Sequence, residues 1–93
     1  MRMPVNTMWL RIDGDRVARV LEEALGKFDG AGGEVVLDFS SVHRIDSSAL
    51  KALETLASAA GDKMIKVALC GVNVDIYKVL KLMKLAPRFS FLA

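Results

Sequence analysis

Apolar and polar residues follow two different periods along the chain, and each period predicts one kind of secondary structure. In Thr7–Ile12 they alternate, so that every second residue from Met8 onward shares one face of a predicted strand. Glu34–Phe39 contains a continuous apolar run, which is typical of a central strand covered on both faces. Further apolar segments predict strands at Met64–Cys70 and, shorter, at Phe89–Leu92.

Three segments show the helical period instead, with apolar residues three or four positions apart. They predict helices at Arg16–Phe28, Ser47–Ala60 and Val74–Leu85, and Asn73 has the chemistry of a cap for the third. The expected buried stripes are Val17, Val20, Leu21, Ala24 and Phe28 in the first helix, Ala49, Leu50, Leu53, Leu56, Ala57 and Ala60 in the second, and Ile76, Val79, Leu80 and Met83 in the third.

The resulting order is β-α-β-α-β-α-β with short connections. Such alternation predicts an α/β fold with a mostly parallel sheet and right-handed crossovers. At 93 residues and 53% hydrophobic content, the chain has the size and composition of one small folded domain over residues 1–93, with residues 1–6 as a loose N-terminal lead.

Composition narrows the choice of partner and compartment. The 13 basic and 11 acidic residues leave a net charge of +2 without a basic run, which argues against direct nucleic acid binding. The single cysteine, Cys70, cannot form an internal disulfide, which suits a reducing compartment. No stretch approaches the roughly 18–20 apolar residues of a membrane span. We therefore expect a cytoplasmic protein without membrane insertion, alone or within a larger assembly.

Asp46-Ser47-Ser48 carries the strongest candidate chemistry. It begins a predicted helix just after the strand Glu34–Phe39 and a short polar loop, where open α/β sheets tend to place functional residues. The first N–H groups of a helix lack internal partners and the helix dipole is positive there, so this position favours added negative charge. Capping alone explains many Asp-Ser pairs, but the context leads to the hypothesis that Ser47 is a phosphorylatable switch.

Enzymatic, cofactor and metal sites find little support. The only histidine, His43, precedes Ser47 by four residues, without a Gly-x-Ser-x-Gly turn or an orienting acid, so a hydrolase is not expected. His43 has no Cys or His companions for a metal ion. Gly30, Gly32 and Gly33 are not followed by the lysine motif of a phosphate-binding loop. We expect no enzyme, no cofactor and no metal.

Other features keep more than one interpretation. Cys70 is predicted to be a small apolar residue at a strand end. The lysines of the last predicted helix, Lys78, Lys81 and Lys84, are expected to form a solvated face in preference to a partner patch. Trp9 and Tyr77 fit exposed anchors and core aromatics equally well.

The run Val-Val-Leu-Asp-Phe-Ser-Ser-Val-His-Arg-Ile-Asp-Ser-Ser-Ala-Leu, residues 35–50, resembles the signature of STAS domains, the family of anti-sigma factor antagonists. There a short loop separates an apolar strand from an Asp-Ser-Ser/Thr-Gly-Leu helix start. Leu10–Asp15 is similar to the family's early strand and turn, and Val79–Leu85 to its last helix. The resemblance implies a mixed, mostly parallel sheet of four to five strands, with three to four helices and a first strand that is short or absent.

The resemblance also implies a regulatory protein-binding domain. In the family's best-known members the serine after Asp is phosphorylated by a partner kinase that is also an anti-sigma factor, and the unphosphorylated form binds this partner. That serine is Ser47 here. The corresponding partner-binding residues are Asp46, Ser47, Ser48, Ala49 and Lys51. As the alternative, STAS domains serve as non-catalytic subunits of lipid-transport ABC systems or signalling scaffolds, with a transporter subunit as partner.

Two departures from the family pattern carry expectations of their own. Ala49 replaces the usual glycine and is expected to put a methyl group where a partner needs close approach to the backbone. The family's first strand is missing or reduced to residues 1–5, which leaves an exposed sheet edge through which the chain could form a homodimer.

Overall fold

A computed structural model of the chain describes residues 7–26 and 33–92. Its elements are β1 (Thr7–Arg11), α1 (Val17–Gly26), β2 (Glu34–Asp38), α2 (Ser47–Asp62), β3 (Lys66–Cys70), α3 (Val74–Leu82), the 3-10 turn η1 (Ala86–Arg88) and β4 (Ser90–Leu92). The predicted order of strands and helices is therefore confirmed, with η1 as an addition. The end of the first predicted helix and the short first strand fall on residues outside the described ranges.

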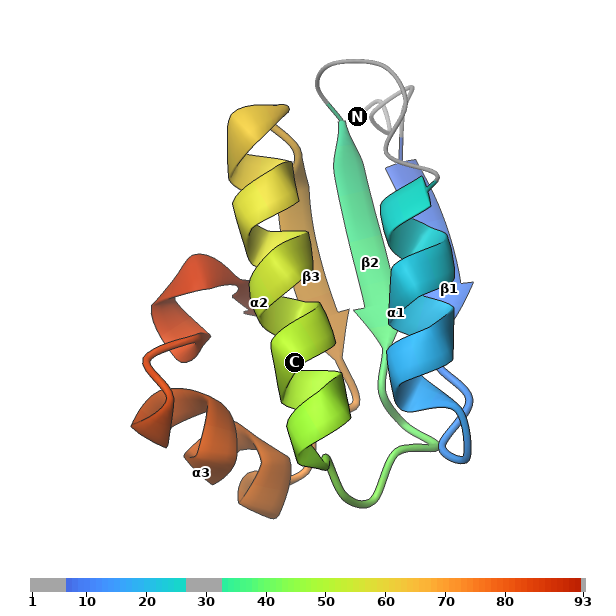
Figure 1. The fold of residues 1–93 in the computed structure, drawn as a ribbon, viewed down its shortest axis with the longest axis vertical. Helices are drawn as coiled ribbons and strands as arrows, with labels where there is room; N and C mark the ends of the chain where they lie inside the picture. Colours follow the sequence, from blue (N-terminus) through green and yellow to red (C-terminus); the bar gives the residue numbers. More distant parts are fainter. Residues whose placement is uncertain (1–6, 27–32, 93) are drawn as a thin grey trace.

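The four strands form one sheet in the order β1-β2-β3-β4, and every described pair is parallel. Figure 1 shows α1 and α2 lying side by side across one face of this sheet, and α3 beyond its β3 side. Because these strands all run parallel, their carboxyl ends, and the loops that follow them, lie at one end of the sheet.

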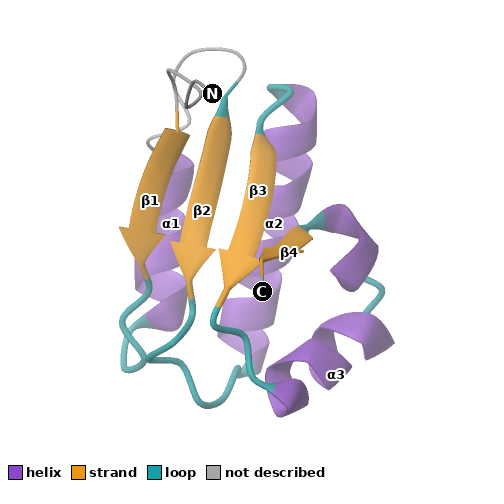
Figure 2. Ribbon diagram, turned by 180° about the vertical axis from the view of Figure 1, so that it is seen from behind, coloured by secondary structure: helices purple, strands orange, loops and turns teal. Residues whose placement is uncertain are grey.

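The core lies between the sheet and the helices. The predicted stripe residues Val17, Leu21, Ala24, Ala49, Leu53, Leu56, Ala57, Ala60, Ile76 and Leu80 are all buried there. Val35 and Leu37 of β2 reach the same core. Their neighbour Val36 points to the other face, which no described helix covers (Figure 2). The expectation that this central strand is covered on both faces is confirmed by the burial of Val35, Val36 and Leu37, although no described helix provides the cover over Val36.

Helices α2 and α3 end in the same kind of turn, although α2 ends two residues later than predicted and α3 three residues earlier. Each helix is followed by a non-glycine residue with positive φ, Met64 at 57° and Lys84 at 59°. The N–H of the next residue then donates back to a carbonyl of the last turn, Ile65 to Ala60 and Leu85 to Leu80, both at 2.8 Å. This is the Schellman arrangement that normally uses glycine. It ends α3 at Leu82 instead of Leu85, leaves Met83 exposed, and delays β3 to Lys66.

Candidate functional site at the start of α2

Helix α2 begins with a cap that the chain itself supplies. Asp46 has extended backbone angles, φ −92° and ψ −179°, and its Oδ1 accepts a hydrogen bond from the Ala49 N–H at 2.8 Å. The Asp46 carbonyl oxygen accepts from the Leu50 N–H at 3.0 Å. The carboxylate thereby satisfies one of the unpaired N–H groups of the first turn, and Ser47 becomes the first helical residue.

The Ser47 side chain is open to solvent at this helix start. Ser47 and Ser48 are both exposed, and nothing in residues 7–26 and 33–92 hydrogen-bonds to the Ser47 hydroxyl. The first turn of α2 contains no acidic residue. A free hydroxyl therefore lies where the positive end of the helix dipole favours an anion.

The loop that presents Ser47 is anchored where it leaves the sheet. Phe39 and Val42 are buried in the core. The Phe39 N–H donates to the Cys70 carbonyl at 2.8 Å, which continues the β2–β3 hydrogen bonding by one residue, and the Val42 N–H donates to the Phe39 carbonyl at 2.9 Å. The loop is thus held at its base by packing and by main-chain hydrogen bonds.

Two neighbouring turns approach this loop closely through glycines. A Cβ atom on Gly14, in the turn after β1, would overlap the Ser41 carbonyl oxygen. A Cβ atom on Gly71, just after β3, would lie 2.8 Å from the Ser40 nitrogen, and Gly71 has φ +69°. Only glycine fits at these two positions.

Two side chains from other elements complete this support. Arg11 Nη2 of β1 donates to Ser41 Oγ at 3.0 Å. Asn73 Nδ2 donates to the His43 carbonyl oxygen at 3.2 Å, while Asn73 Oδ1 accepts from the Ile76 N–H at 2.8 Å and caps α3. Because Asn73 uses both ends of its amide, it ties the start of α3 to the loop that carries Ser47.

Two neighbouring titratable side chains, Asp38 and Cys70, lie at the ends of β2 and β3 beneath the loop. The Ser40 N–H donates to Asp38 Oδ1 at 2.9 Å and lowers the pKa of Asp38 below its ordinary value. The Ser40 hydroxyl and the positive charge of Arg11 act in the same direction. Burial raises the pKa of the adjacent Cys70 thiol, and the Asp38 charge raises it further. Asp38 is therefore ionised and Cys70 protonated at neutral pH.

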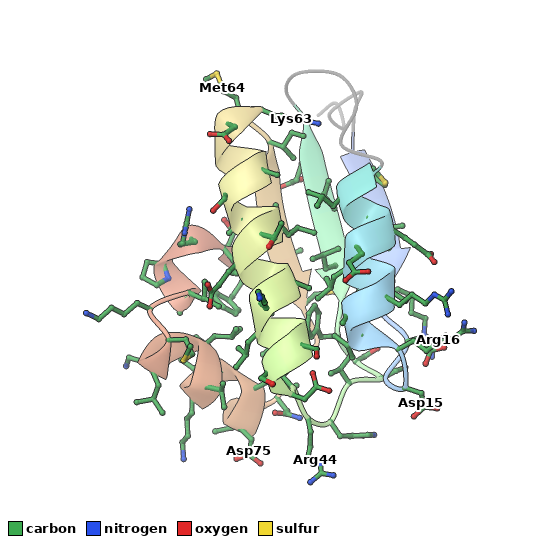
Figure 3. The ribbon with its side chains drawn as sticks, in the orientation of Figure 1. Asp15, Arg16, Arg44, Lys63, Met64 and Asp75 are labelled. Carbon is green, nitrogen blue, oxygen red and sulfur yellow. The ribbon has the colours of Figure 1, made fainter. Side chains whose placement is uncertain are left out.

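A cleft of about 540 Å³ lies beside the cap, between the start of α1 and the loop before α2. We call it the arginine cleft, after its lining residues Arg16, Arg19 and Arg44; Asp15 and Asp46 also line it. Figure 3 shows Asp15, Arg16 and Arg44 at the same end of the molecule as the start of α2, with Arg44 projecting into solvent. The cleft therefore offers charged groups of both signs next to Ser47.

The predicted partner-binding residues divide into two groups. Asp46, Ser47, Ser48 and Lys51 are exposed. Ser48 and Lys51 line a second cleft of about 320 Å³ between α1 and α2. Ala49 is only 1% exposed and packs in the core, although it also belongs to the lining of the arginine cleft.

The remaining candidates lie apart from this group. His43 is exposed in the loop, and Cys70 occupies a strand end as predicted. Trp9 is exposed on β1, while Tyr77 is partly exposed with its ring edge-on to Phe91 at 5.2 Å between centroids. Within the described ranges, no group of three or more His, Cys, Asp or Glu residues could hold a metal ion. None of the described helices is long and apolar enough to cross a bilayer.

Sequence reasoning did not identify the residues that support the loop from a distance. Arg11, Gly14, Gly71 and Asn73 reach it from three other segments. The only signal in the sequence was Asn73 as a helix cap, which says nothing of its second hydrogen bond, because the other partner is 30 residues away.

The comparisons with known proteins place this arrangement in a family. The chain is similar in structure to a protein from Thermotoga maritima provisionally named an anti-sigma factor antagonist, with a TM-score of 0.71 and 16% identity over 97% of this chain and 81% of that one. It is also similar to an anti-sigma-factor antagonist (STAS) domain protein from Planctomyces limnophilus, with a TM-score of 0.69 and 20% identity over 87% of this chain and 71% of that one.

These likenesses concern the fold, because the identities are low. A comparison with curated proteins gave no significant match. The family model described as the STAS domain matches residues 9–92, which includes all of the elements from β2 to β4 and the whole site at the start of α2. The chain belongs to the STAS domain family.

Proposed function

We propose that the protein is a regulatory protein-binding domain of the anti-sigma factor antagonist type, switched by phosphorylation of Ser47. The observation that carries the proposal is the exposed hydroxyl of Ser47, free of hydrogen bonds from the described residues, at the first position of α2. The partner is a serine kinase that also acts as an anti-sigma factor, as for the family's best-known members. The setting of this function is the cytoplasm.

The position of Ser47 at the start of α2 explains why the domain would tolerate a phosphate there without unfolding. In the reaction the γ-phosphoryl group of ATP is transferred to Ser47 Oγ, the hydroxyl proton leaves to a base of the kinase, and ADP is released. The phosphate adds about −1.5 to −2 charge. The positive end of the helix favours it, and Lys51, one turn further along α2, is a cation at the favourable i,i+4 spacing.

The same charge explains release of the partner. Asp46, Ser47, Ser48 and Lys51 form an exposed surface flanked by the arginine cleft and by the cleft between α1 and α2. A partner fitted to a neutral hydroxyl would have to desolvate or face a dianion next to Asp46 after phosphorylation, which is unfavourable. Phosphorylation is therefore expected to weaken docking at this surface without unfolding the domain.

Incubation with the cognate serine kinase and radiolabelled ATP tests the site. We expect label on the wild type and on the Ser48→Ala variant, and none on the Ser47→Ala variant. Since Ser47 and Ser48 are adjacent and both exposed, Ser48→Ala is a matched control for access. Persistent labelling of the Ser47→Ala variant would contradict the assignment of the site.

Affinity for the kinase, measured by calorimetry, tests the switch separately. The Ser47→Asp variant is expected to bind at least about tenfold more weakly than wild type, because it places a charge at the same point. Equal binding by both would instead support the alternative, a constitutive STAS subunit of a lipid-transport system or a signalling scaffold. In that case a membrane ATPase should co-purify equally with both variants.

A further inference from the structure

The exposed apolar residues gather at the C-terminal end of the chain. Seven large apolar side chains are exposed among the described residues, and five of them lie between Val74 and Leu92. Three of these five, Val74, Tyr77 and Leu92, are 68%, 41% and 44% exposed and line one cavity. Single exposed apolar residues are normal on a protein surface, but a group around a hollow marks an interaction site.

The hollow lies between the start of α3 and β4, and we call it the α3–β4 groove. Its volume is about 410 Å³, and its lining residues are Leu69, Gly71, Val72, Asn73, Val74, Tyr77, Phe91 and Leu92. Asn73 and Tyr77 are the lining residues with polar side-chain groups, and the Asn73 amide already serves the α3 cap and the His43 carbonyl. Figure 2 shows α3 below β4, next to the end of β3. A groove of this size and lining suits a bulky apolar side chain.

The rim of the groove is basic. On α3 the exposed residues Val74, Tyr77, Lys78 and Lys81 follow the spacing i, i+3, i+4, i+7, so the two lysines lie one turn beyond the two apolar residues on the same helix face. Between Val74 and Leu92 there are four basic residues and one acidic residue, Asp75, against nine basic and ten acidic residues before Val74. The positive excess of the chain therefore lies in the segment that carries α3 and β4.

We propose that the α3–β4 groove binds an acidic amphipathic helical segment of another protein. One bulky apolar side chain of the segment enters the groove between Val74, Tyr77 and Leu92, and its acidic residues face Lys78 and Lys81. A helix laid in an apolar groove with complementary charges at the rim is a common mode of peptide recognition. This surface shares no residue with the Ser47 surface, and the proposal does not depend on phosphorylation.

A protein segment fits this surface better than an anionic membrane does. Basic and apolar residues on one helix also occur in membrane-surface helices, where the apolar residues project outward into the lipid. Here Val74, Tyr77 and Leu92 surround a hollow, which needs a protruding side chain to fill it. The lysines would attract an acidic peptide and an anionic membrane alike. The concave shape of the groove therefore favours the peptide.

Selection from a display library of random 16-residue peptides, with the full chain as bait, tests the proposal. We expect enriched peptides with a net negative charge and a bulky apolar residue at helical spacing from the acids. Amide chemical shifts of a ¹⁵N-labelled chain should move at residues 69–77 and 91–92 when such a peptide is added. Failure to enrich any peptide, or enrichment of neutral or basic peptides, overturns the proposal.

Variants of the rim sharpen the test. The Val74→Asp variant introduces an acid at the first helical position, where it favours helix formation, so the chain should stay folded. We expect it to weaken binding of an enriched peptide at least about tenfold, and Lys78→Glu with Lys81→Glu to weaken it by a similar factor. The Lys66→Glu control, at the opposite end of β3, should change the affinity less than about twofold.

Equal binding of the peptide by the Val74→Asp variant would overturn the proposal, as would binding that Lys66→Glu weakens as much as the rim variants do. Binding to vesicles of phosphatidylcholine with about 30% phosphatidylserine tests the alternative that the surface binds an anionic membrane. Vesicle binding that Val74→Asp abolishes, without any peptide enrichment, would show that the surface binds membranes instead.

Discussion

Helices α2 and α3 begin in the same way and serve the fold differently. Asp46 and Asn73 both have extended backbone angles, and each accepts a hydrogen bond at 2.8 Å from the N–H three residues ahead. Yet α2 has 16 residues and buries five of them, whereas α3 has nine residues and buries two. The same capping geometry is therefore found at the start of a central core helix and of a peripheral helix.

The difference in cap chemistry matches the difference in role. The Asp46 carboxylate can only accept hydrogen bonds, so beyond capping α2 it contributes charge to the exposed surface around Ser47. The Asn73 amide can also donate, and it uses that donor to hold the loop before α2. One helix start therefore presents the candidate switch, and the other supports it from behind.

The largest expected change in the free energy of unfolding comes from the difference between α2 and α3 in their contribution to the core. Leu53 of α2 is fully buried, so Leu53→Ala should reduce the free energy of unfolding by about 2–5 kcal/mol. Leu82 of α3 is 81% exposed, so Leu82→Ala should change it by less than about 0.5 kcal/mol. Urea denaturation of both variants measures the contrast, and similar losses of stability would contradict the peripheral position of the end of α3.

The next effect tests the support of the Ser47 loop by Gly71. Gly71→Ala places a methyl group against Ser40 at a positive φ, and should cost about 1–3 kcal/mol. Gly61→Ala is the control, because a methyl group there meets no atom within 4 Å and an alanine favours the helix by up to about 1 kcal/mol. Thermal unfolding should therefore move in opposite directions for the two variants.

A smaller effect compares the two caps directly. Asp46→Ala should cost about 1 kcal/mol, the usual value of a lost cap. Asn73→Ala should cost about 2 kcal/mol, because it also removes the hydrogen bond to the His43 carbonyl. Asn73→Asp keeps the cap acceptor but not the donor, so it should fall between wild type and Asn73→Ala in urea denaturation. Equal costs for Asp46→Ala and Asn73→Ala would mean that the tie to the loop adds nothing.

The smallest effect concerns Asp38 and pH. Its pKa is lowered in the folded state, so ionised Asp38 stabilises the fold at pH values above the ordinary aspartate pKa of about 4. This contribution is lost as the pH falls below that value and through the lower folded pKa. The stability difference between wild type and Asp38→Asn should therefore be constant from about pH 7 to 5 and shrink towards about pH 3. Urea denaturation at each pH checks it, and a difference that grows on acidification would contradict the sign.

Local signals predicted most of the fold. Alternation in Thr7–Ile12 and the helical stripe around Leu53 depend on periods that the sequence states directly, and both elements form as expected. The predicted end of α3 was wrong. The residue with positive φ after this helix is Lys84, and a lysine in the sequence does not indicate a Schellman ending as a glycine would. The helical stripe also predicted that Ala49 is buried, which the structure confirms, while the effect of its methyl group on a partner stays a prediction.

The candidate site was predicted only in part, because some of its features depend on neighbouring residues and others on contacts between distant segments. The Asp46 cap and the position of Ser47 follow from neighbouring residues, so the motif predicts them. The contacts of Arg11 and Asn73 with the loop join residues 30 positions apart, and they exist only once the parallel sheet has brought the strand ends together. The α3–β4 groove likewise requires β4 to lie beside β3.

The residues with left-handed backbone angles after α2 and α3 indicate where the stability of this domain could be increased. Met64 and Lys84 each adopt a backbone geometry that a side chain resists, yet neither lines the clefts near Ser47 or the α3–β4 groove. An engineer who wants a hardier version of the protein, with both recognition faces intact, should begin with glycine at these two sites.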